Sequence, residues 1–242
     1  MSREPRQLLT QAGEDLAVEG VPLRQIADQF GTPCYVYSAQ TLRAQYRQLA
    51  SALNLIESRI HYSVKANSNL GILTLFKELG AGFDIVSGGE LSRVLAIGGD
   101  PSDVIFSGVG KSVAEIDLAL KVGVGCFNVE SRSELIRIQQ RAELAQKVAP
   151  ISIRVNPDID ANTHPYISTG LKDSKFGVDA NTALTLYSIA AKSKALSITG
   201  IDCHIGSQIA STGPLLEALE SILKVVDTLS DGGIELQHVN LG

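Results

Sequence analysis

Hydrophobic residues in this chain form short β-type runs that alternate with amphipathic stretches of helical period. The first clear helical stretch follows Ser38, a residue type that caps helices, and it places Leu42, Tyr46, Leu49 and Leu53 on one face. The same alternation continues to the end of the chain. The pattern therefore predicts an α/β protein.

Seven β-type runs follow one another at an even spacing. They are HYSVKAN (61–67), FDIVS (83–87), VIFSG (104–108), CFNVES (126–131), ISIRVN (151–156), ITGIDCHIGS (198–207) and HVNLG (238–242). Strands separated by one helix and short loops are parallel, and nearly continuous apolar runs indicate strands buried on both faces. We therefore predict a (β/α)8 barrel with seven of its eight strands present. A doubly wound open sheet is the alternative, but SVKANSN is not the glycine-rich phosphate loop that it would need.

Signals at helix ends support these units. Ser112 with Glu115, and Ser131 with Glu134, have the spacing of a capping box at a helix start. Gly80 and the glycine pair at 98–99 predict helix ends.

Two segments depart from the rhythm. The segment TPCYVYS (32–38) predicts an additional strand outside the barrel, so we expect an N-terminal segment at 1–38 and the barrel at 39–242. The long stretch from Pro157 to Ala180 contains two X-Pro pairs, and a loop of this length in a compact domain is more often functional than idle.

Composition narrows the functional classes. The chain is 44% hydrophobic and carries a net charge of -5, which argues against a nucleic-acid partner because phosphate neutralisation needs a basic surface. Its apolar runs are too short to span a membrane, and its N-terminus lacks an apolar signal core. The three cysteines have no metal-ligand spacing and read as free thiols in a reducing compartment. We expect a cytoplasmic protein without a metal site.

Lys65 is the first candidate for chemistry, because it lies near the end of the first β-type run, between Val64 and Ala66. A charge that points into a barrel is costly, and a desolvated lysine loses its proton and attacks carbonyls readily. A lysine at a strand end that reaches solvent explains the local pattern equally well.

His204 lies at the end of the sixth run, and active sites of such barrels lie at the carboxyl ends of the strands. An imidazole there can stack on a flat ring or move a proton, although a lone histidine is more often a core residue. Gly206 and Ser207 follow, and a small residue beside a hydroxyl suits a phosphate.

Asp84 in the second run and Arg154 in the fifth suggest partners inside the barrel, for which ion pairing and catalysis are equally plausible. His61 and His238 begin runs, at the opposite end of the barrel, and we interpret both as structural.

The motifs become specific when they are read in order. HYSVKAN, AGFDIVSGGEL, SGVGKS, FNVES, THPYISTGLKDSKFG (163–177) and CHIGSQI together closely resemble the diaminopimelate decarboxylase family, within the alanine-racemase-like fold group of pyridoxal-phosphate (PLP) enzymes. The resemblance covers about residues 20 to 242, and the segment 163–177 is its most discriminating part. The lysine run and CHIGS are shared more widely among barrel decarboxylases.

The resemblance implies roles for individual residues. Lys65 matches the lysine that binds PLP, His204 the histidine that stacks on the cofactor ring, and Ser207 the serine that binds its phosphate. Asp84 and Arg154 match polar residues near the cofactor. Gly242 matches the first glycine of the family's phosphate-binding GGG loop.

The resemblance also implies an activity: decarboxylation of meso-2,6-diaminopimelate to L-lysine, by a homodimer when the protein is full length. The family's Glu-Pro-Gly-Arg segment and its C-terminal β-domain are absent from this sequence. We therefore expect a fragment of a longer polypeptide, inactive by itself. The alternatives are a decarboxylase of another basic amino acid, a non-catalytic PLP-carrier barrel, and an inactive protein that serves only as a partner.

Overall fold

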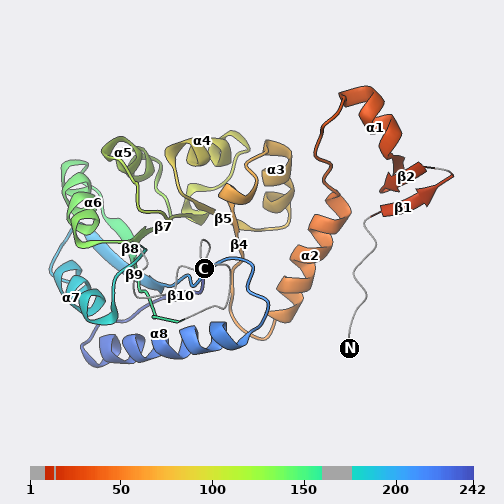
Figure 1. Ribbon diagram of the computed structural model, residues 1–242. Helices are drawn as coiled ribbons and strands as arrows, with labels where there is room; N and C mark the ends of the chain where they lie inside the picture. The colour runs from red at the N-terminus through yellow and green to blue at the C-terminus, as the bar shows by residue number, and fades with distance from the viewer. Residues whose placement is uncertain (1–8, 14, 160–175) are drawn as a thin grey trace. The chain divides into compact units, whose positions relative to one another are not determined.

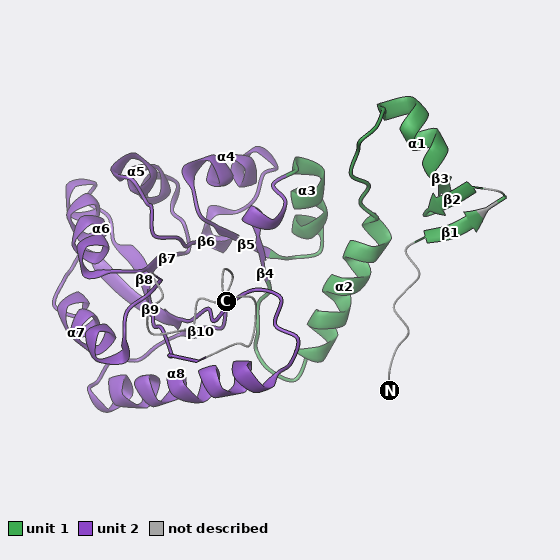
Figure 2. Ribbon diagram, viewed as in Figure 1, with its two compact units in different colours: residues 1–60, 69–81 green, residues 61–68, 82–242 purple. Residues whose placement is uncertain are grey.

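The computed structural model describes residues 9–13, 15–159 and 176–242 (Figure 1). The chain divides into two compact units, which Figure 2 distinguishes by colour. Unit 1 comprises residues 1–60 and 69–81, and unit 2 comprises 61–68 and 82–242. The domain boundary predicted after residue 38 stays a prediction.

Unit 1 begins with a small antiparallel sheet, which the sequence pattern did not predict. Its elements are β1 (Leu9–Ala12), β2 (Asp15–Val18) and β3 (Val21–Pro22), followed by the helices α1 (Leu23–Phe30), α2 (Ala39–Ala52) and α3 (Leu70–Glu78). Glu19 and Gly20 join β2 to β3, and both have positive φ angles (53° and 81°). Positive φ at both central residues matches the twist of a tight hairpin. The Glu19-Gly20 sequence was therefore the local indication of a hairpin here.

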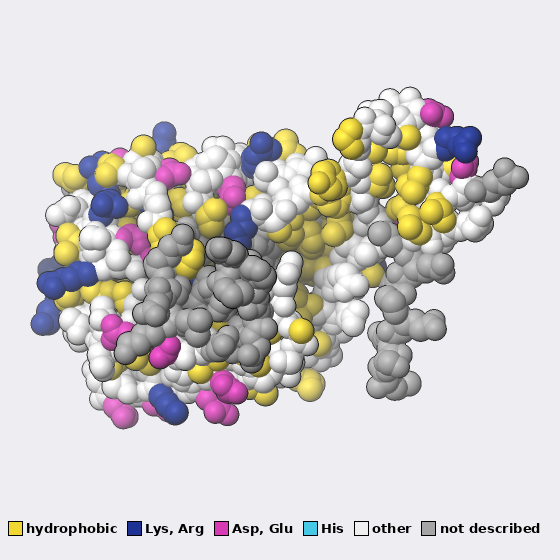
Figure 3. Space-filling model, viewed as in Figure 1, with side chains coloured by type: hydrophobic (Ala, Val, Ile, Leu, Met, Phe, Trp, Pro, Cys, Tyr) yellow, Lys and Arg dark blue, Asp and Glu magenta, His cyan; other side chains and the backbone are white. Residues whose placement is uncertain are grey.

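The strand predicted at 32–38 is wrong, because these residues form no strand in the structure. Tyr35 and Tyr37 are exposed, at 92% and 55%, so no sheet face covers them. The predicted cap is confirmed: the Ser38 hydroxyl accepts a hydrogen bond from the Thr41 N–H at the start of α2. Hydrophobic side chains also lie on the surface of unit 1 around β1–β3, as Figure 3 shows.

Unit 2 is a single parallel sheet covered by helices. Its strands are β4 (His61–Ser63), β5 (Gly82–Ile85), β6 (Val104–Phe106), β7 (Cys126–Val129), β8 (Ala149–Arg154), β9 (Leu196–Asp202) and β10 (His238–Asn240). Its helices are α4 (Gly88–Ala96), α5 (Val113–Val122), α6 (Arg132–Leu144), α7 (Ala180–Ala190) and α8 (Gly213–Asp231), with the 3₁₀ turns η1 (Val64–Ala66) and η2 (Pro101–Asp103).

The seven strands lie in the sheet in the same order as in the chain, and every neighbouring pair is parallel. A doubly wound sheet reverses its strand order at a switch point, and this sheet has none. The strands curve round a common centre, with the helices outside (Figure 1). The predicted barrel architecture with seven strands is therefore confirmed.

The two faces of this sheet differ in chemistry. Side chains that alternate outward are large and apolar, and Phe83, Phe106, Phe127 and Ile153 among them are almost completely buried. Most inward side chains of the same strands are polar, with Ile105 of β6 as an exception; the polar ones include Asp84, Asn128, Ser152, Arg154 and Asp202. Both faces are buried as predicted, but the alternation of polar residues, rather than a continuous apolar run, marks the interior.

The pairing of β8 with β9 contains a β-bulge. The strand register shifts between Ile151 and Ser152. The Tyr187 hydroxyl lies beside the shift, donating to the Gly200 carbonyl (2.7 Å) and accepting from the Ile153 N–H (3.3 Å). Buried backbone groups need partners, so this hydroxyl stabilises the bulged register.

Both predicted helix starts are confirmed, but only one of the two predicted capping boxes is complete. Ser112 and Glu115 form a reciprocal capping box on α5. Ser131 caps α6, but the carboxylate of Glu134 accepts from the Glu130 N–H (2.6 Å) instead of closing the second box. None of the helices in the described part of the chain is long and apolar enough to cross a membrane.

Candidate active site

Lys65 lies in the 3₁₀ turn η1, not within a strand as predicted. β4 ends where Ser63 pairs with Asp84 of β5, and the chain then turns. The sequence analysis expected the Lys65 side chain to be buried inside the barrel, but in the structure it is exposed. Exposure agrees with the alternative of a strand-end lysine, and it also leaves the amine open to a carbonyl compound.

Asp84 is fixed by hydroxyl groups from the neighbouring strand ends. One carboxylate oxygen accepts from the Ser107 Oγ (2.5 Å), and the other accepts from the Ser63 Oγ (3.3 Å). Asn128 on β7 donates in turn to Ser107 (3.1 Å). Burial raises the pKa of the Asp84 carboxyl, against the lowering effects of the Ser107 hydrogen bond and the charge of Lys65.

Arg154 ends β8 and is held on several sides. Its Nη1 donates to Glu130 (3.0 Å), its Nε lies 3.9 Å from Asp202, and its Nη2 donates to the His204 carbonyl (3.4 Å). The guanidinium also lies 5.0 Å from the centre of the Phe176 ring. A nearly buried guanidinium held in this way has a fixed orientation.

Asp84 and Arg154 each have partners inside the barrel, and no ion pair joins the two directly among the described residues. The Asp84 oxygens are taken by Ser63 and Ser107, and Arg154 pairs with acids on the flanking strands β7 and β9. The Arg154 charge nevertheless lowers the pKa of Asp84, against the larger raising effect of burial.

Asp202 is an acid that the sequence analysis did not single out. It ends β9 and is 4% exposed. Burial raises the pKa of its carboxyl to about 7, against the lowering effect of Arg154, and the nearby charges of Asp84 and Glu130 raise it further. The Asp202 carboxyl therefore lies near the charges of Arg154, Asp84 and Glu130 at the carboxyl ends of the sheet.

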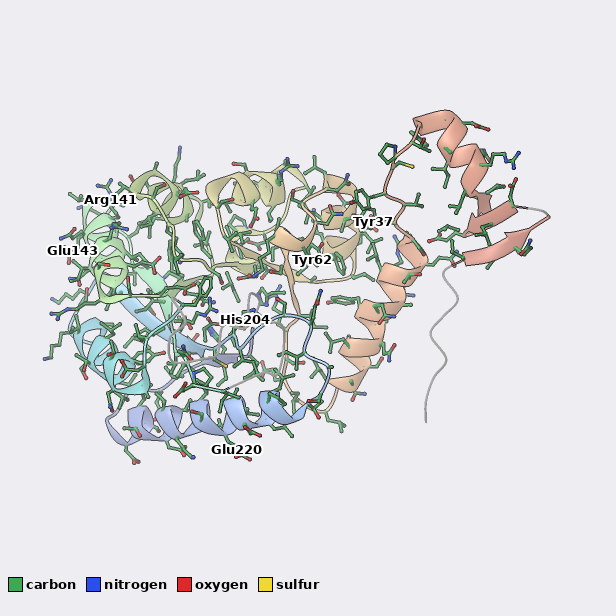
Figure 4. The ribbon with its side chains drawn as sticks, viewed as in Figure 1. Tyr37, Tyr62, Arg141, Glu143, His204 and Glu220 are labelled. Atoms are coloured by element: carbon green, nitrogen blue, oxygen red, sulfur yellow. The ribbon has the colours of Figure 1, made fainter. Side chains whose placement is uncertain are left out.

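His204 follows β9 in the loop that lies toward the centre of unit 2 (Figure 4). Burial, followed by the positive charges of Arg154 and Lys65, lowers the pKa of its imidazole to about 4. The ring is therefore neutral at pH 7. Because Lys65 affects both Asp84 and His204, these side chains occupy one region of the barrel.

Gly242 lies directly beside His204. A methyl group added at Gly242, which has a φ of +91°, would overlap the imidazole. The position therefore requires glycine for both space and backbone conformation. Ser207 lies in the same loop as His204, and its side chain is exposed.

These side chains suit a flat anionic cofactor that carries an aldehyde. The accessible amine of Lys65 can react with the aldehyde. The neutral ring of His204 can face an aromatic ring without a charge penalty. The close approach of the Gly242 backbone to that ring leaves no side chain in the way, and the Ser207 hydroxyl is free to face solvent or a phosphate. By contrast, no group of three or more potential metal ligands occurs among the residues that the structure describes.

Comparison with known proteins defines the class first. Residues 39–242 match the family described as pyridoxal-dependent decarboxylase, pyridoxal binding domain, and the chain belongs to this family. The particular relatives are diaminopimelate decarboxylases. That of Pseudomonas aeruginosa is 56% identical over 229 residues, which are 94% of this chain and 55% of the relative. That of Neisseria meningitidis serogroup B is 54% identical over 227 residues, again 94% of this chain and 55% of the relative.

A solved structure gives the same result for the fold. The crystal structure of diaminopimelate decarboxylase from Helicobacter pylori complexed with L-lysine is 42% identical, with a TM-score of 0.88. The match covers 91% of this chain and 56% of that one. The chain therefore spans about half the length of the curated relatives it matches.

The segment 163–177, which carried much of the resemblance, lies outside the described residues except for Phe176 and Gly177. Those two residues do reach the site: Phe176 lies against Arg154, and the Gly177 N–H donates to Glu130 (3.1 Å). The end of the segment is thus attached to the polar network at the strand ends.

Sequence reasoning missed several polar residues of this region. Glu130, Asp202 and Ser107 each lie at or directly after the end of a strand, which was the available signal. Glu130 lies inside FNVES, next to the helix-cap residue Ser131, and the motif was interpreted only as a helix start. Asp202 lies two residues before His204, and only the histidine was assigned a role.

Proposed function

We propose that the full-length protein is a PLP-dependent decarboxylase that converts meso-2,6-diaminopimelate into L-lysine and carbon dioxide. The observation that carries the proposal is identity at more than half of the aligned positions with diaminopimelate decarboxylases, across 94% of this chain. The Helicobacter pylori relative was solved with L-lysine, the amino acid that this reaction releases.

This proposal gives each candidate residue a task in holding the cofactor. Lys65 holds PLP covalently through Nζ, His204 faces the cofactor ring, and Ser207 and Gly242 bind the phosphate. Asp84 and Arg154 lie beside the cofactor and shape the electrostatic potential around it. The support is their convergence at the carboxyl ends of the strands, where barrel enzymes carry their active sites.

The chain's own residues then handle orientation and protons. PLP, when bound, supplies a sink for the electron pair that stays on the substrate as carbon dioxide leaves. A proton replaces the lost carboxylate on the same carbon, and we assign Nζ of Lys65 to carry it. His204 stays neutral at pH 7, since its pKa is about 4, and so it supports the ring without adding a positive charge there.

A decarboxylase of another basic amino acid is the runner-up. A lysine decarboxylase from Selenomonas ruminantium shares the fold at a TM-score of 0.79 but is 26% identical to this chain. The much higher identity of the diaminopimelate decarboxylases favours diaminopimelate as the substrate.

The test is a substrate panel on the full-length protein loaded with PLP. Carbon dioxide release is measured with meso-diaminopimelate, ornithine, arginine and lysine. We expect turnover of diaminopimelate at least about tenfold faster than of the others, a difference of ~1.4 kcal/mol in activation free energy. Faster turnover of one of the other three would assign the protein to the runner-up, and PLP binding without turnover of any would favour a carrier.

We also infer that the full-length protein is a cytoplasmic homodimer. The free thiols of Cys34, Cys126 and Cys203 suit a reducing compartment. The dimer follows from the resemblance to the family, and light scattering on the full-length protein tests it: a mass of one subunit contradicts the inference.

A further inference from the structure

A buried ion pair lies behind the residues of the candidate site. The Lys111 side chain has no exposed surface (0%), and its Nζ makes three hydrogen bonds. It donates to the carbonyls of Gly108 (2.7 Å) and Asn128 (2.8 Å) and to the carboxylate of Glu134 (2.9 Å). An ammonium has three donors, so this lysine is fully satisfied and has no proton left to offer a ligand.

The second carboxylate oxygen of Glu134 fixes the backbone of Glu130. It accepts from the N–H of Glu130 at 2.6 Å. The Glu134 carboxylate therefore links Lys111 to the end of β7, which explains why it does not close a capping box with Ser131.

Glu130 joins three loops at the carboxyl ends of the strands. Its Oε1 accepts from Arg154 (3.0 Å) and from the Gly108 N–H (3.1 Å), and its Oε2 accepts from the Gly177 N–H (3.1 Å). Its side chain is 2% exposed. Arg154, held in this way, donates to the carbonyl of His204. A continuous chain of charge-assisted bonds thus runs from Lys111 to the backbone of the residue assigned to the cofactor ring.

We propose that Glu130 is a positioning residue for the cofactor site: it orients Arg154, and through Arg154 the His204 loop, while Lys111 and Glu134 anchor its own backbone. The proposal rests on the proposed function in one respect, that His204 faces PLP. Glu130 itself acts through Arg154 and does not need to touch the cofactor. Loss of its carboxylate leaves the nearly buried guanidinium with two longer contacts, to the His204 carbonyl (3.4 Å) and to Asp202 (3.9 Å). It also removes an acceptor from the backbone N–H groups of Gly108 and Gly177.

The experiment compares Glu130→Gln with Glu115→Gln in the full-length protein. Glu115 is a matched control, because it also accepts a backbone N–H from a neighbouring loop (Gly88, 2.7 Å), yet it has no bond to Arg154 in the described residues. For both variants we measure the Kd for PLP and the visible circular dichroism of bound PLP per mole of cofactor. The dichroism reports how the cofactor sits among its neighbours, so a loss of stability alone does not change it once it is normalised to bound cofactor.

We expect Glu130→Gln to raise the PLP Kd by at least tenfold and to alter the normalised dichroism, while Glu115→Gln stays within twofold of the wild type in both. Glu130→Asp keeps the charge on a shorter side chain and replaces Glu130→Gln if the latter does not fold. Kd and dichroism within twofold of the wild type in the folded variant overturn the proposal. Neither measurement uses a substrate, so a wrong substrate assignment leaves this test intact.

Discussion

The two ends of the seven-stranded sheet are built differently. At the carboxyl ends, Arg154 lies 3.9 Å from Asp202, Asp84 accepts a hydrogen bond from Ser107, and the charges of Arg154 and Asp84 both shift the pKa of Asp202. At the amino ends, His61 lies opposite Gly82 and His238 lies opposite Gly200. Charges with perturbed pKa values gather at one end, and histidine rings packed over glycines fill the other. Because barrel enzymes place their chemistry at the carboxyl ends, this contrast separates positions for function from positions for stability.

The largest effect that this contrast predicts is on covalent cofactor binding by Lys65 at the carboxyl end. In Lys65→Ala, PLP should no longer become fixed to the protein by borohydride reduction, whereas peptide mapping of the reduced wild type should find the label on Lys65. The free energy of unfolding should change little, because the side chain is exposed. Lys224→Ala on α8, another exposed lysine, is the control and should keep the label. A label that persists in Lys65→Ala removes Lys65 from the site.

The second largest expected effect is a loss of stability when the buried ion pair between Lys111 and Glu134 is broken. Lys111→Met leaves the Glu134 carboxylate buried without its cation, and breaking a buried pair in this way costs about 3–5 kcal/mol. Urea unfolding of the full-length protein, read by circular dichroism, measures the loss. The double variant Lys111→Met with Glu134→Leu removes both charges and should recover part of it. A single variant that loses less than about 1 kcal/mol would mean that the pair is not buried in solution.

Sequence patterns predicted the positions of these two lysines unequally well. The spacing of the β-type runs placed Lys65 and His204 at strand ends. In the structure the charge of Lys65 influences the pKa of both Asp84 and His204, so the three side chains lie in one region. Lys111 lies in the glycine-rich turn SGVGK, and the sequence pattern assigned it no role. Its burial depends on Glu134 and on a carbonyl of β7, both far from it in sequence, so a local pattern contains no signal for it.

The same limit applies to other elements. The barrel rhythm was predictable because each strand and helix repeats a local period. The sheet β1–β3 was missed because all three of its strands are short. Its β2–β3 hairpin depends on the Glu19-Gly20 turn, a weaker signal than the run of aromatic and β-branched residues at 32–38. Those residues favour strands, but without a neighbouring strand to pair with they stay exposed.

The third prediction concerns pH and the carboxyl end. Burial raises the pKa of Asp202 from 3.8 to about 7, so its protonated form is favoured in the folded protein. Its contribution to stability is fully present below pH 3.8 and is lost as the pH rises through 7. Asp202→Asn cannot ionise, and relative to the wild type it should therefore gain stability between pH 4 and 8, by at most about 4 kcal/mol.

Urea midpoints of Asp202→Asn and wild type at pH 4.5, 6 and 8 test this sign. Taking the difference between the two proteins cancels the other groups that titrate in the window, notably Asp84, His204 and His238. A difference that stays constant with pH, or that turns against Asp202→Asn as the pH rises, contradicts the raised pKa.

The smallest effect belongs to the amino end and tests the other half of the comparison. A methyl group at Gly200 would overlap the ring of His238, whose Nε2 is buried without a hydrogen-bond partner among the described residues. Gly200→Ala should therefore destabilise the full-length protein by about 1–3 kcal/mol through overpacking. His238→Ala removes the ring, so adding Gly200→Ala to it should cost less than half as much as in the wild type. PLP affinity should stay within twofold in all three variants, because this end of the sheet holds no group assigned to the cofactor. A tenfold weaker PLP affinity in Gly200→Ala would show that the amino ends of the strands are coupled to the cofactor site, and the division into a functional and a structural end would then be wrong.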